Sequence, residues 1–230
     1  MLFRSDLAIA CEERGWALGV GSQRRELEGR SLPEEAALLR KSAPRAFLIA
    51  NLGISQVISA GVPAIRRVVD SLEAQALVVH LNPLQEALQP EGTPQFRGGL
   101  AALERLVREL GVPVLVKETG CGLSASTLLR LARTGVAAID VSGLGGTHWG
   151  RIEGARAPAS SPGRLAAGVF AGWGESTVDS VLAAREALLK TPGARYALWA
   201  SGGVRSGLDA ARLIALGADR VGYAQRSEEH

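Results

Sequence analysis

Cysteine, aromatic residues and long apolar runs are all scarce in this chain of 230 residues. Cys11 and Cys121 are far apart, which excludes a disulfide framework and a cysteine-based metal site and fits a reducing compartment. No apolar run approaches the ~18 residues of a membrane span. The first residues lack the basic start and apolar stretch of a secretory signal. We therefore expect a soluble cytoplasmic protein that does not act at a membrane.

Strong charge is also missing. The net charge is +3 and the isoelectric point is near 9.2, with basic residues dispersed along the chain. This balance is too weak to indicate nucleic-acid binding, although it suits a phosphorylated substrate. Aromatic residues make up 4% and glycines number 28, so small residues and tight turns carry much of the architecture. A hydrophobic content of 47% is ample for a large globular core.

Short, continuous apolar runs recur along the chain and read as strands that are buried on both faces, as in a parallel sheet. Segments with helical spacing of leucine and alanine lie between them, several ending at a glycine. The expected strands are 16–20, 46–50, 76–79, 112–116, 136–141, 196–200 and 220–224, and the clearest helices are 100–110, 124–132, 178–190 and 208–216.

This alternation predicts a single α/β domain over residues 1–230, a (β/α)8 TIM barrel with about seven of its eight strands. A doubly wound sheet is the alternative. Residues 157–168 contain proline, glycine and serine and lack a clear period. We expect them to form a long, mobile loop.

Polar or glycine-rich residues follow every predicted strand. In a parallel barrel, all of these strand ends lie on one face, where active sites form. Any one of these ends could be explained as an ordinary turn, but seven in succession predict an active site. The strand ends are 21–24, 51–53, 80–82, 117–118, 142–147, 201–205 and 224–225.

Two of these ends carry a specific chemistry. Residues 201–207 join glycines to the start of a helix, which would let backbone N–H groups approach a phosphate. Lys117 ends an apolar strand, so its ammonium would point into the barrel mouth and need an anionic or electron-rich partner. Glu118 should face another way, because side chains alternate along a strand.

The segment 80–86 is the most informative. It places an imidazole (His80), two carboxamides (Asn82 and Gln85) and a carboxylate (Glu86) where a buried strand gives way to a loop. A buried strand tolerates such groups at its exit, where they meet a ligand, a metal or water. A polar loop that satisfies its own backbone is the alternative interpretation.

Four segments together resemble type 2 isopentenyl diphosphate isomerase, an FMN-dependent (β/α)8 barrel family related to the flavin α-hydroxy acid oxidases. The similarity runs in order over nearly the whole chain, and the HLNPLQE segment is the most specific part of it. The segments are 80–92, 116–118, 139–147 and 200–209.

The resemblance implies a reaction and a set of site residues. The family moves a double bond between isopentenyl and dimethylallyl diphosphate, and reduced FMN is thought to act as its acid and base. The resemblance further implies Mg²⁺, NAD(P)H as the reductant and a homo-oligomer, a tetramer or octamer. It assigns Ser22, Asn51, Lys117, Ser142 and Thr147 to FMN; Gly203, Val204, Arg205, Ala224 and Gln225 to the FMN phosphate; Arg24, His80, Asn82 and Gln85 to the substrate; and Glu86 to Mg²⁺.

Within that set, Arg24 would help to hold the diphosphate, whereas His80 and Gln85 would position groups more than move protons. Trp149 would close over the alkenyl chain, or else be an interface or loop aromatic. His148 has no assigned role. Compared with the family, the first barrel strand and the last helix have no counterpart in the sequence. Two rival functions stay open: an oxidase acting on α-hydroxy acids, and an inactive FMN-binding barrel.

Overall fold

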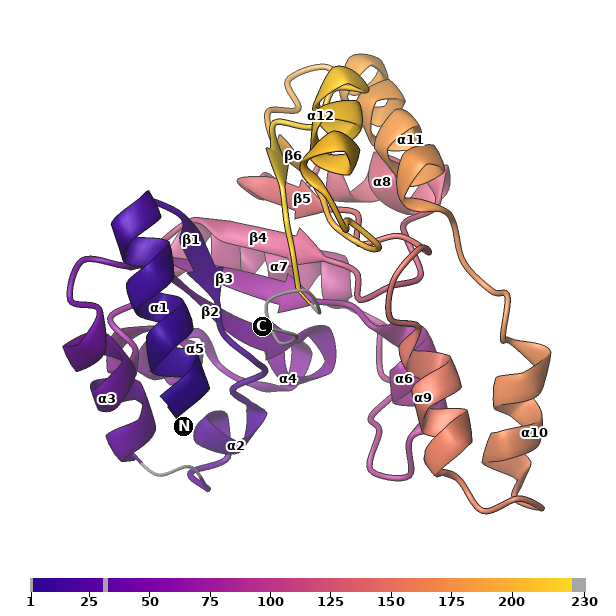
Figure 1. Cartoon of the computed structure of the whole chain (residues 1–230), viewed down its shortest axis with the longest axis horizontal. Coiled ribbons are helices and arrows are strands. Elements are labelled where there is room, and N and C mark those ends of the chain that lie inside the picture. Colours follow the sequence, from indigo (N-terminus) through magenta and orange to yellow (C-terminus); the bar gives the residue numbers. More distant parts are fainter. Residues whose placement is uncertain (1, 31–32, 225–230) are drawn as a thin grey trace.

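The computed structural model describes residues 2–30 and 33–224, which form one curved parallel sheet with helices on its outer face (Figure 1). Seven strands are present in this part of the chain, and each matches an expected run to within a few residues. They are β1 (Ala17–Gly19), β2 (Phe47–Gly53), β3 (Ala76–His80), β4 (Val114–Lys117), β5 (Ala138–Asp140), β6 (Ala197–Ala200) and β7 (Arg220–Val221).

Helices connect the strands, so that every connection is a parallel crossover. Serine side chains cap several of them: Ser124, for example, accepts a hydrogen bond from the backbone N–H of Thr127 at the start of α8. The helices are α1 (Leu2–Arg14), α2 (Arg24–Leu27), α3 (Pro33–Ser42), α4 (Ile54–Ser59), α5 (Val62–Ser71), α6 (Pro83–Leu88), α7 (Gly99–Glu109), α8 (Ala125–Leu131), α9 (Trp149–Arg156), α10 (Pro162–Val169), α11 (Thr177–Lys190) and α12 (Gly207–Ala215).

The strand order settles the topology. The strands follow one another from β1 to β7, and all neighbours are parallel. A doubly wound sheet reverses its order at a switch point, so that alternative was wrong. Within the described residues β1 and β7 are not paired with each other, and the sheet is an incomplete (β/α) barrel, as expected.

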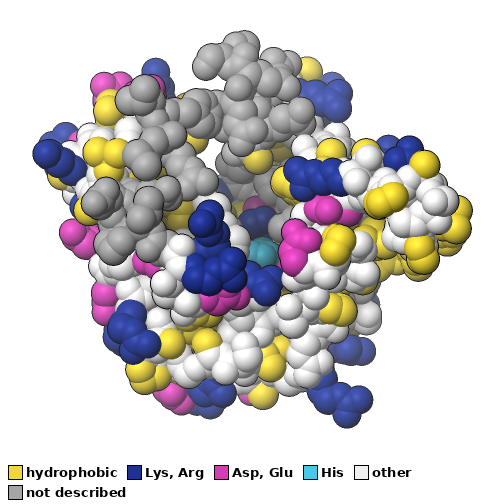
Figure 2. All heavy atoms as spheres, turned by 90° about the horizontal axis from the view of Figure 1, so that it is seen from below, with side chains coloured by type: hydrophobic (Ala, Val, Ile, Leu, Met, Phe, Trp, Pro, Cys, Tyr) yellow, Lys and Arg dark blue, Asp and Glu magenta, His cyan; other side chains and the backbone are white. Residues whose placement is uncertain are grey.

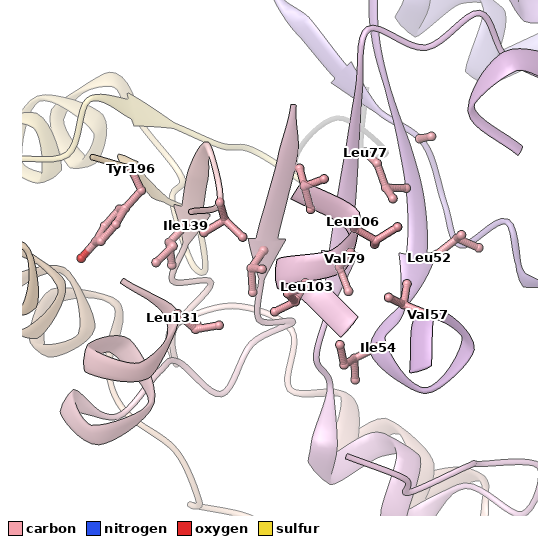
Figure 3. Packing of buried hydrophobic residues seen from close by; sticks show 14 of the residues in the cluster. Leu52, Ile54, Val57, Leu77, Val79, Leu103, Leu106, Leu131, Ile139 and Tyr196 are labelled. Atoms are coloured by element: carbon pink, nitrogen blue, oxygen red, sulfur yellow. The ribbon is translucent and has the colours of Figure 1, made fainter. Parts of the chain in front are cut away.

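Two apolar layers sandwich the sheet. The larger one lies between the strands and the outer helices, where Leu103 and Leu106 of α7 pack toward Leu77 and Val79 of β3 (Figure 3). The smaller one lies on the inner face of the curve, where Trp199 packs against a cluster of buried side chains: Ile49, Ala76, Val78, Leu115 and Ala138. Because both faces are covered, the strands read as continuous apolar runs.

The expectation of a long loop over residues 157–168 was wrong. Most of this segment forms α10, which packs against α9 and lies away from the sheet (Figure 1). Ser161 caps the helix by accepting a hydrogen bond from the backbone N–H of Arg164, and Pro162 occupies the first turn. Proline and serine are favourable at a helix start, so residues that resembled loop signals were start signals.

Among the described residues, no helix has both the length and the apolar character needed to cross a lipid bilayer.

Candidate active site at the carboxyl ends of the strands

Strand register brings three inward-facing polar side chains to one level, those of His80, Lys117 and Asp140. Gly53 pairs with His80, His80 with Lys117, and Lys117 with Asp140. Because side chains alternate along a strand, these residues point to the same face as the inner apolar cluster, one layer nearer the carboxyl ends. With Asn51 and Ser201 they line the mouth of the barrel. We call Asn51, His80, Lys117, Asp140 and Ser201 the polar layer.

Asn51 and His80 form a buried pair in this layer. His80 Nδ1 lies 2.8 Å from Asn51 Oδ1, and Asn51 Nδ2 donates to the carbonyl oxygen of Val20 at 2.9 Å. Gln23 holds the Asn51 backbone from both sides, accepting from its N–H and donating to its carbonyl. Burial, with a smaller contribution from the Lys117 cation, lowers the pKa of His80 to about 3. The imidazole is therefore neutral at physiological pH.

Lys117 lies in the mouth, as expected. Its Nζ donates to the backbone carbonyl of Glu118 at 2.8 Å. Burial lowers the pKa of the Lys117 ammonium, and the carboxylates of Asp140 and Glu118 oppose that shift. Asp140 is itself fixed, since Ser201 Oγ donates to both of its carboxylate oxygens at 2.9 and 2.8 Å. The mouth thus combines a cation and an anion at adjacent strand ends.

The prediction that Glu118 faces away from the mouth is supported by its contacts. Its carboxylate accepts hydrogen bonds from the backbone N–H groups of Thr119 at 2.5 Å and Cys121 at 2.7 Å. Burial raises the pKa of the Glu118 carboxyl. The residue organises the loop after β4 and is 2% exposed, which leaves Lys117 as the polar residue of this strand end that belongs to the polar layer.

The segment after β3 forms a chain of directed hydrogen bonds. Thr119 Oγ1 donates to Asn82 Oδ1 at 2.6 Å, Asn82 Nδ2 donates to Gln85 Oε1, and Gln85 Nε2 donates to Glu153 Oε1 at 2.7 Å. Asn82 adopts a left-handed backbone with φ of 46°, which asparagine tolerates better than most residues. Glu153, a buried carboxylate of α9, accepts at the end of the chain and so sets the orientation of both carboxamides.

Glu86 and Arg24 lie near enough to each other for their charges to interact. Glu86 is buried, and its Oε2 accepts a hydrogen bond from the backbone N–H of Thr93 at 2.7 Å. A hydrogen bond from Arg24 to Glu28 raises the pKa of the Arg24 guanidinium, and the charges of Glu86 and Glu91 add to that effect. Within the described residues, no group of three or more metal-ligating side chains comes together. A cation at Glu86 would therefore take its remaining oxygen ligands from a bound molecule or water.

Two glycine loops lie directly against each other at the far side of the mouth. A Cβ on Gly146 would approach the backbone nitrogen of Gly203 to 2.7 Å, and a Cβ on Gly203 would collide with the backbone of Gly145. Gly203 has a φ of 80°. Arg205 links the loops by donating from Nη2 to the carbonyl of Gly145 at 3.3 Å. Bare backbone and a guanidinium thus converge beside the start of α12, the arrangement a phosphate needs.

The other predicted residues vary in their placement. Ser22 is exposed just beyond β1, and Ser142 is buried after β5 with φ of 37°. Thr147 lies in the loop that follows, and Ala224 is the last residue described. The Val204 side chain packs into the outer apolar core, so its backbone alone faces the loops. The expected role of Gln225 lies outside the described residues.

Trp149 and His148 open α9. Trp149 is 36% exposed on the first turn. His148 is buried and caps the helix, with Nδ1 accepting from the backbone N–H of Arg151 at 3.1 Å and Nε2 lying 3.4 Å from the carbonyl oxygen of Trp173. Nδ1 thus caps α9 and Nε2 contacts the backbone at Trp173, which gives the residue that the sequence left unassigned a structural role.

A hollow at the surface contains a histidine between groups of charged side chains (Figure 2). A cavity of about 380 Å³ is lined by residues outside the polar layer, including Leu81, Glu118, Cys121 and Trp173. Burial raises the pKa of the Cys121 thiol to about 12, so this lining thiol is unreactive at physiological pH. We place the site in the mouth, where the polar layer and the glycine loops meet, and not in this cavity.

Sequence reasoning missed Glu153, Asp140 and Ser201 as site residues. Glu153 follows Trp149 by one helical turn and ends the carboxamide chain, but only tertiary packing shows its partner. Asp140 and Ser201 end neighbouring strands, which is a signal that register arguments recover. Their mutual contact explains why a carboxylate lies at the end of an apolar strand.

The model of the FMN-dependent dehydrogenase family matches residues 60–226. This chain belongs to that family. Within that family, the sequence is similar to relatives named isopentenyl-diphosphate delta-isomerase. The protein of Bdellovibrio bacteriovorus is 56% identical over 219 residues, which cover 95% of this chain and 62% of the relative. That of Aeropyrum pernix is 48% identical over 222 residues, covering 95% and 57%. The chain thus spans about three fifths of the length of these relatives.

Solved structures support the fold alone. Inosine 5'-monophosphate dehydrogenase from Legionella pneumophila matches with a TM-score of 0.59 and 16% identity over 94% of this chain and 53% of that one. A mandelate oxidase variant that carries an FMN adduct matches with a TM-score of 0.58 and 19% identity, over 95% and 58%. The family's curved parallel sheet is therefore shared with enzymes of different chemistry.

Proposed function

We propose that this chain forms the greater part of an FMN-dependent isopentenyl-diphosphate isomerase, which interconverts isopentenyl and dimethylallyl diphosphate without net redox change. The observation that carries the proposal is the carboxamide chain from Asn82 through Gln85 to Glu153, set between the polar layer and Glu86. The relatives of that name, 56% and 53% identical, support it. The proposal includes a cytoplasmic homo-oligomer, a tetramer or octamer, and NAD(P)H as the source of electrons.

The residues of the mouth fit FMN. The glycine loops around Gly145 and Gly203 leave backbone exposed where the phosphate would lie, with Arg205 beside them. Lys117 belongs to the polar layer, and its ammonium would stabilise a negative charge on the flavin ring. Ser22, Asn51, Ser142 and Thr147 would contact the ribityl chain and ring edge, and Gln225 would join Ala224 at the phosphate. When bound in its reduced form, FMN would supply the acid and base that protonation of an alkene requires.

The diphosphate of the substrate would lie at the Glu86 side of the mouth. Mg²⁺ prefers oxygen ligands and is commonly held by one or two carboxylates together with phosphate oxygens. Glu86 keeps one oxygen on the Thr93 backbone and offers the other to such a cation. Arg24 adds a guanidinium nearby, restrained by Glu28. Together they would neutralise the diphosphate and fix the position of its alkenyl chain.

The remaining residues orient the alkene and exclude water. His80, Asn82 and Gln85 are held by fixed hydrogen bonds, so they bind the substrate without reorganising when charge develops. Trp149 stands at the start of α9 with part of its ring exposed, where it would cover the alkenyl chain. A carbocation-like state needs a dry, electron-rich surrounding, and an indole face provides one.

The oxidase alternative needs a catalytic histidine after β5. His148 is in that region, yet it is buried and its Nδ1 accepts from the Arg151 backbone. A catalytic base must reach the proton that it removes, whereas the His148 imidazole caps α9 with its Nδ1. We therefore favour the isomerase.

The decisive experiment incubates the purified protein anaerobically with dithionite-reduced FMN, Mg²⁺ and isopentenyl diphosphate. Formation of dimethylallyl diphosphate that stops when Mg²⁺ is chelated is the expected result. Glu86→Gln should raise the Mg²⁺ concentration needed for half-maximal rate, whereas the matched change Glu109→Gln, at an exposed position on α7, should not. Oxidation of 2-hydroxy acids without isomerisation would establish the oxidase instead, and bound FMN without either activity would indicate an inactive barrel.

A further inference from the structure

The two ends of the Asn51 side chain are distinguishable from their surroundings. One end lies 2.9 Å from the backbone carbonyl oxygen of Val20, and the other lies 2.8 Å from His80 Nδ1. A carbonyl oxygen accepts hydrogen bonds and cannot donate, so the end that faces Val20 must be the amide nitrogen. The end that faces His80 is therefore the carboxamide oxygen, an acceptor.

This orientation determines the protonation of His80. Because Asn51 Oδ1 only accepts, His80 Nδ1 must carry the proton of their hydrogen bond. The neighbouring Lys117 cation, at the paired register position, opposes a second proton on the ring. A neutral imidazole has one N–H, so Nε2 retains a lone pair.

The Nε2 edge of the buried His80 ring lies beside Gly53 and the Gln56 side chain. Gly53 is the register partner of His80, and a Cβ there would lie 3.0 Å from Nε2 and still closer to Gln56 Oε1, so this position leaves room for both polar side chains. Among the described residues, Nε2 has no hydrogen-bond partner, whereas Nδ1 has one. Lys117, the register partner of His80 on the other side, carries an ammonium whose Nζ donates to the backbone carbonyl of Glu118. An acceptor and a donor thus lie at adjacent strand ends.

We propose that His80 meets the bound molecule as a hydrogen-bond acceptor through Nε2, and that Asn51 fixes this role. The group opposite must be an N–H or O–H donor. Unprotonated phosphate oxygens only accept, so His80 does not hold a diphosphate directly. Two groups would supply such a donor. One is the imide N–H of a bound flavin ring, whose neighbouring carbonyl would accept from Lys117. The other is a water ligand of a bound Mg²⁺. The nature of the ligand rests on the proposed function, but the state of the imidazole does not.

His148 provides an internal contrast. Its Nδ1 accepts from the backbone N–H of Arg151, which can only donate, so its proton must lie on Nε2. The two histidines within the described part of the chain therefore hold opposite tautomers, each set by a neighbour with a fixed role.

Nitrogen-15 NMR of the full chain labelled at histidine tests the first part. Long-range correlation of the ring nitrogens with the carbon-bound protons distinguishes the two tautomers and the imidazolium ion. His80→Gln and His148→Gln assign the signals. We expect His80 protonated at Nδ1 and His148 at Nε2 in the ligand-free protein at neutral pH. A His80 imidazolium, or His80 protonated at Nε2, overturns the inference.

Two variants test the part played by Asn51. Asn51→Ala removes the acceptor and should allow His80 to populate the Nε2–H tautomer, whereas Asn51→Asp keeps an acceptor beside Nδ1 and should retain the Nδ1–H. An unchanged His148 pattern in the same spectra shows that each variant is folded. A His80 pattern that Asn51→Ala leaves untouched contradicts the assigned role.

Ligand additions test the contact itself. Oxidised FMN, inorganic diphosphate alone, and inorganic diphosphate with Mg²⁺ are added in separate samples. We expect FMN or the Mg²⁺ sample to move the Nε2 resonance in the direction of a received hydrogen bond, with Nδ1–H kept, and whichever does so identifies the donor. Protonation of Nε2 by diphosphate alone, or no response to any addition, refutes the contact. Absence of isomerase activity would leave these observations intact, so the two proposals fail separately.

Discussion

Gln85 Nε2 donates a hydrogen bond to Glu153 Oε1 at 2.7 Å, although 68 residues separate the two in the chain. This contact joins the segment after β3 to α9, so residues from two different crossovers orient one group of carboxamides. The arrangement yields the first of four predictions.

Glu153→Gln should reduce the isomerase rate by roughly 10- to 100-fold. A hydrogen bond to a charged group contributes about 1.5–3 kcal/mol. A carboxamide at position 153 can donate as well as accept, so it would no longer fix the orientation of the Gln85 carboxamide. We expect the loss mainly in kcat, because the diphosphate contacts are unaffected. Arg156→Ala is the matched control, since Arg156 pairs with the same carboxylate at 3.4 Å from an exposed position. An equal loss in both variants would contradict a role in orientation.

Gly203→Ala should abolish FMN binding and lower stability. The added methyl group meets the backbone of Gly145, and the φ of 80° is one that alanine adopts only with strain. Gly207→Ala has open space at the position of its Cβ and should leave FMN affinity unchanged. Flavin fluorescence titration and urea denaturation of both variants distinguish a specific effect from a general one. Normal flavin affinity in Gly203→Ala would exclude the glycine loops as the phosphate site.

Stability should fall as the pH is lowered from 6.5 toward 3. The pKa of His80 is about 3 in the folded protein and 6.5 when exposed, so between these values the unfolded chain binds a proton that the folded chain does not. The free energy of unfolding therefore decreases by up to ~1.4 kcal/mol per pH unit, and the full contribution is present above pH 6.5.

Urea denaturation at a series of pH values, repeated with His80→Gln, isolates this effect. The raised pKa of Glu118 acts in the opposite direction but is common to both proteins. The difference between their free energies of unfolding should therefore change with pH by the amount expected for the binding of one proton. Parallel profiles would show that His80 is not buried as a neutral group.

Leu106→Ala should destabilise the protein by roughly 2–5 kcal/mol, because it leaves a cavity in the outer core between α7 and the sheet. Leu106 is 0% exposed, whereas Leu189 on α11 is 82% exposed. Leu189→Ala makes the same chemical change at the surface and should alter stability by less than about 0.5 kcal/mol. Thermal and urea unfolding compare the two, and similar losses would mean that the helix layer does not carry the fold.

Much of this fold was predictable from local sequence. Strands such as 76–79 are buried on both faces, so the apolar run itself marks them, and the glycines that end helices mark the connections. The segment 157–168 was misinterpreted because proline and serine serve equally well in loops and at helix starts. The side chains of the mouth were predictable as a set, since parallel strands present their ends on one face.

The sequence by itself determined the parallel sheet, the position of polar groups at its carboxyl edge and the chemistry of the segment from His80 to Glu86. Only the tertiary structure decided which partner each polar group has: Asn51 for His80, Glu153 for Gln85, and Ser201 for Asp140. Backbone periodicity and burial are local properties and can be read along the chain. Hydrogen-bond direction, tautomer and pKa depend on atoms brought together by folding, and for these the chain order carries no signal.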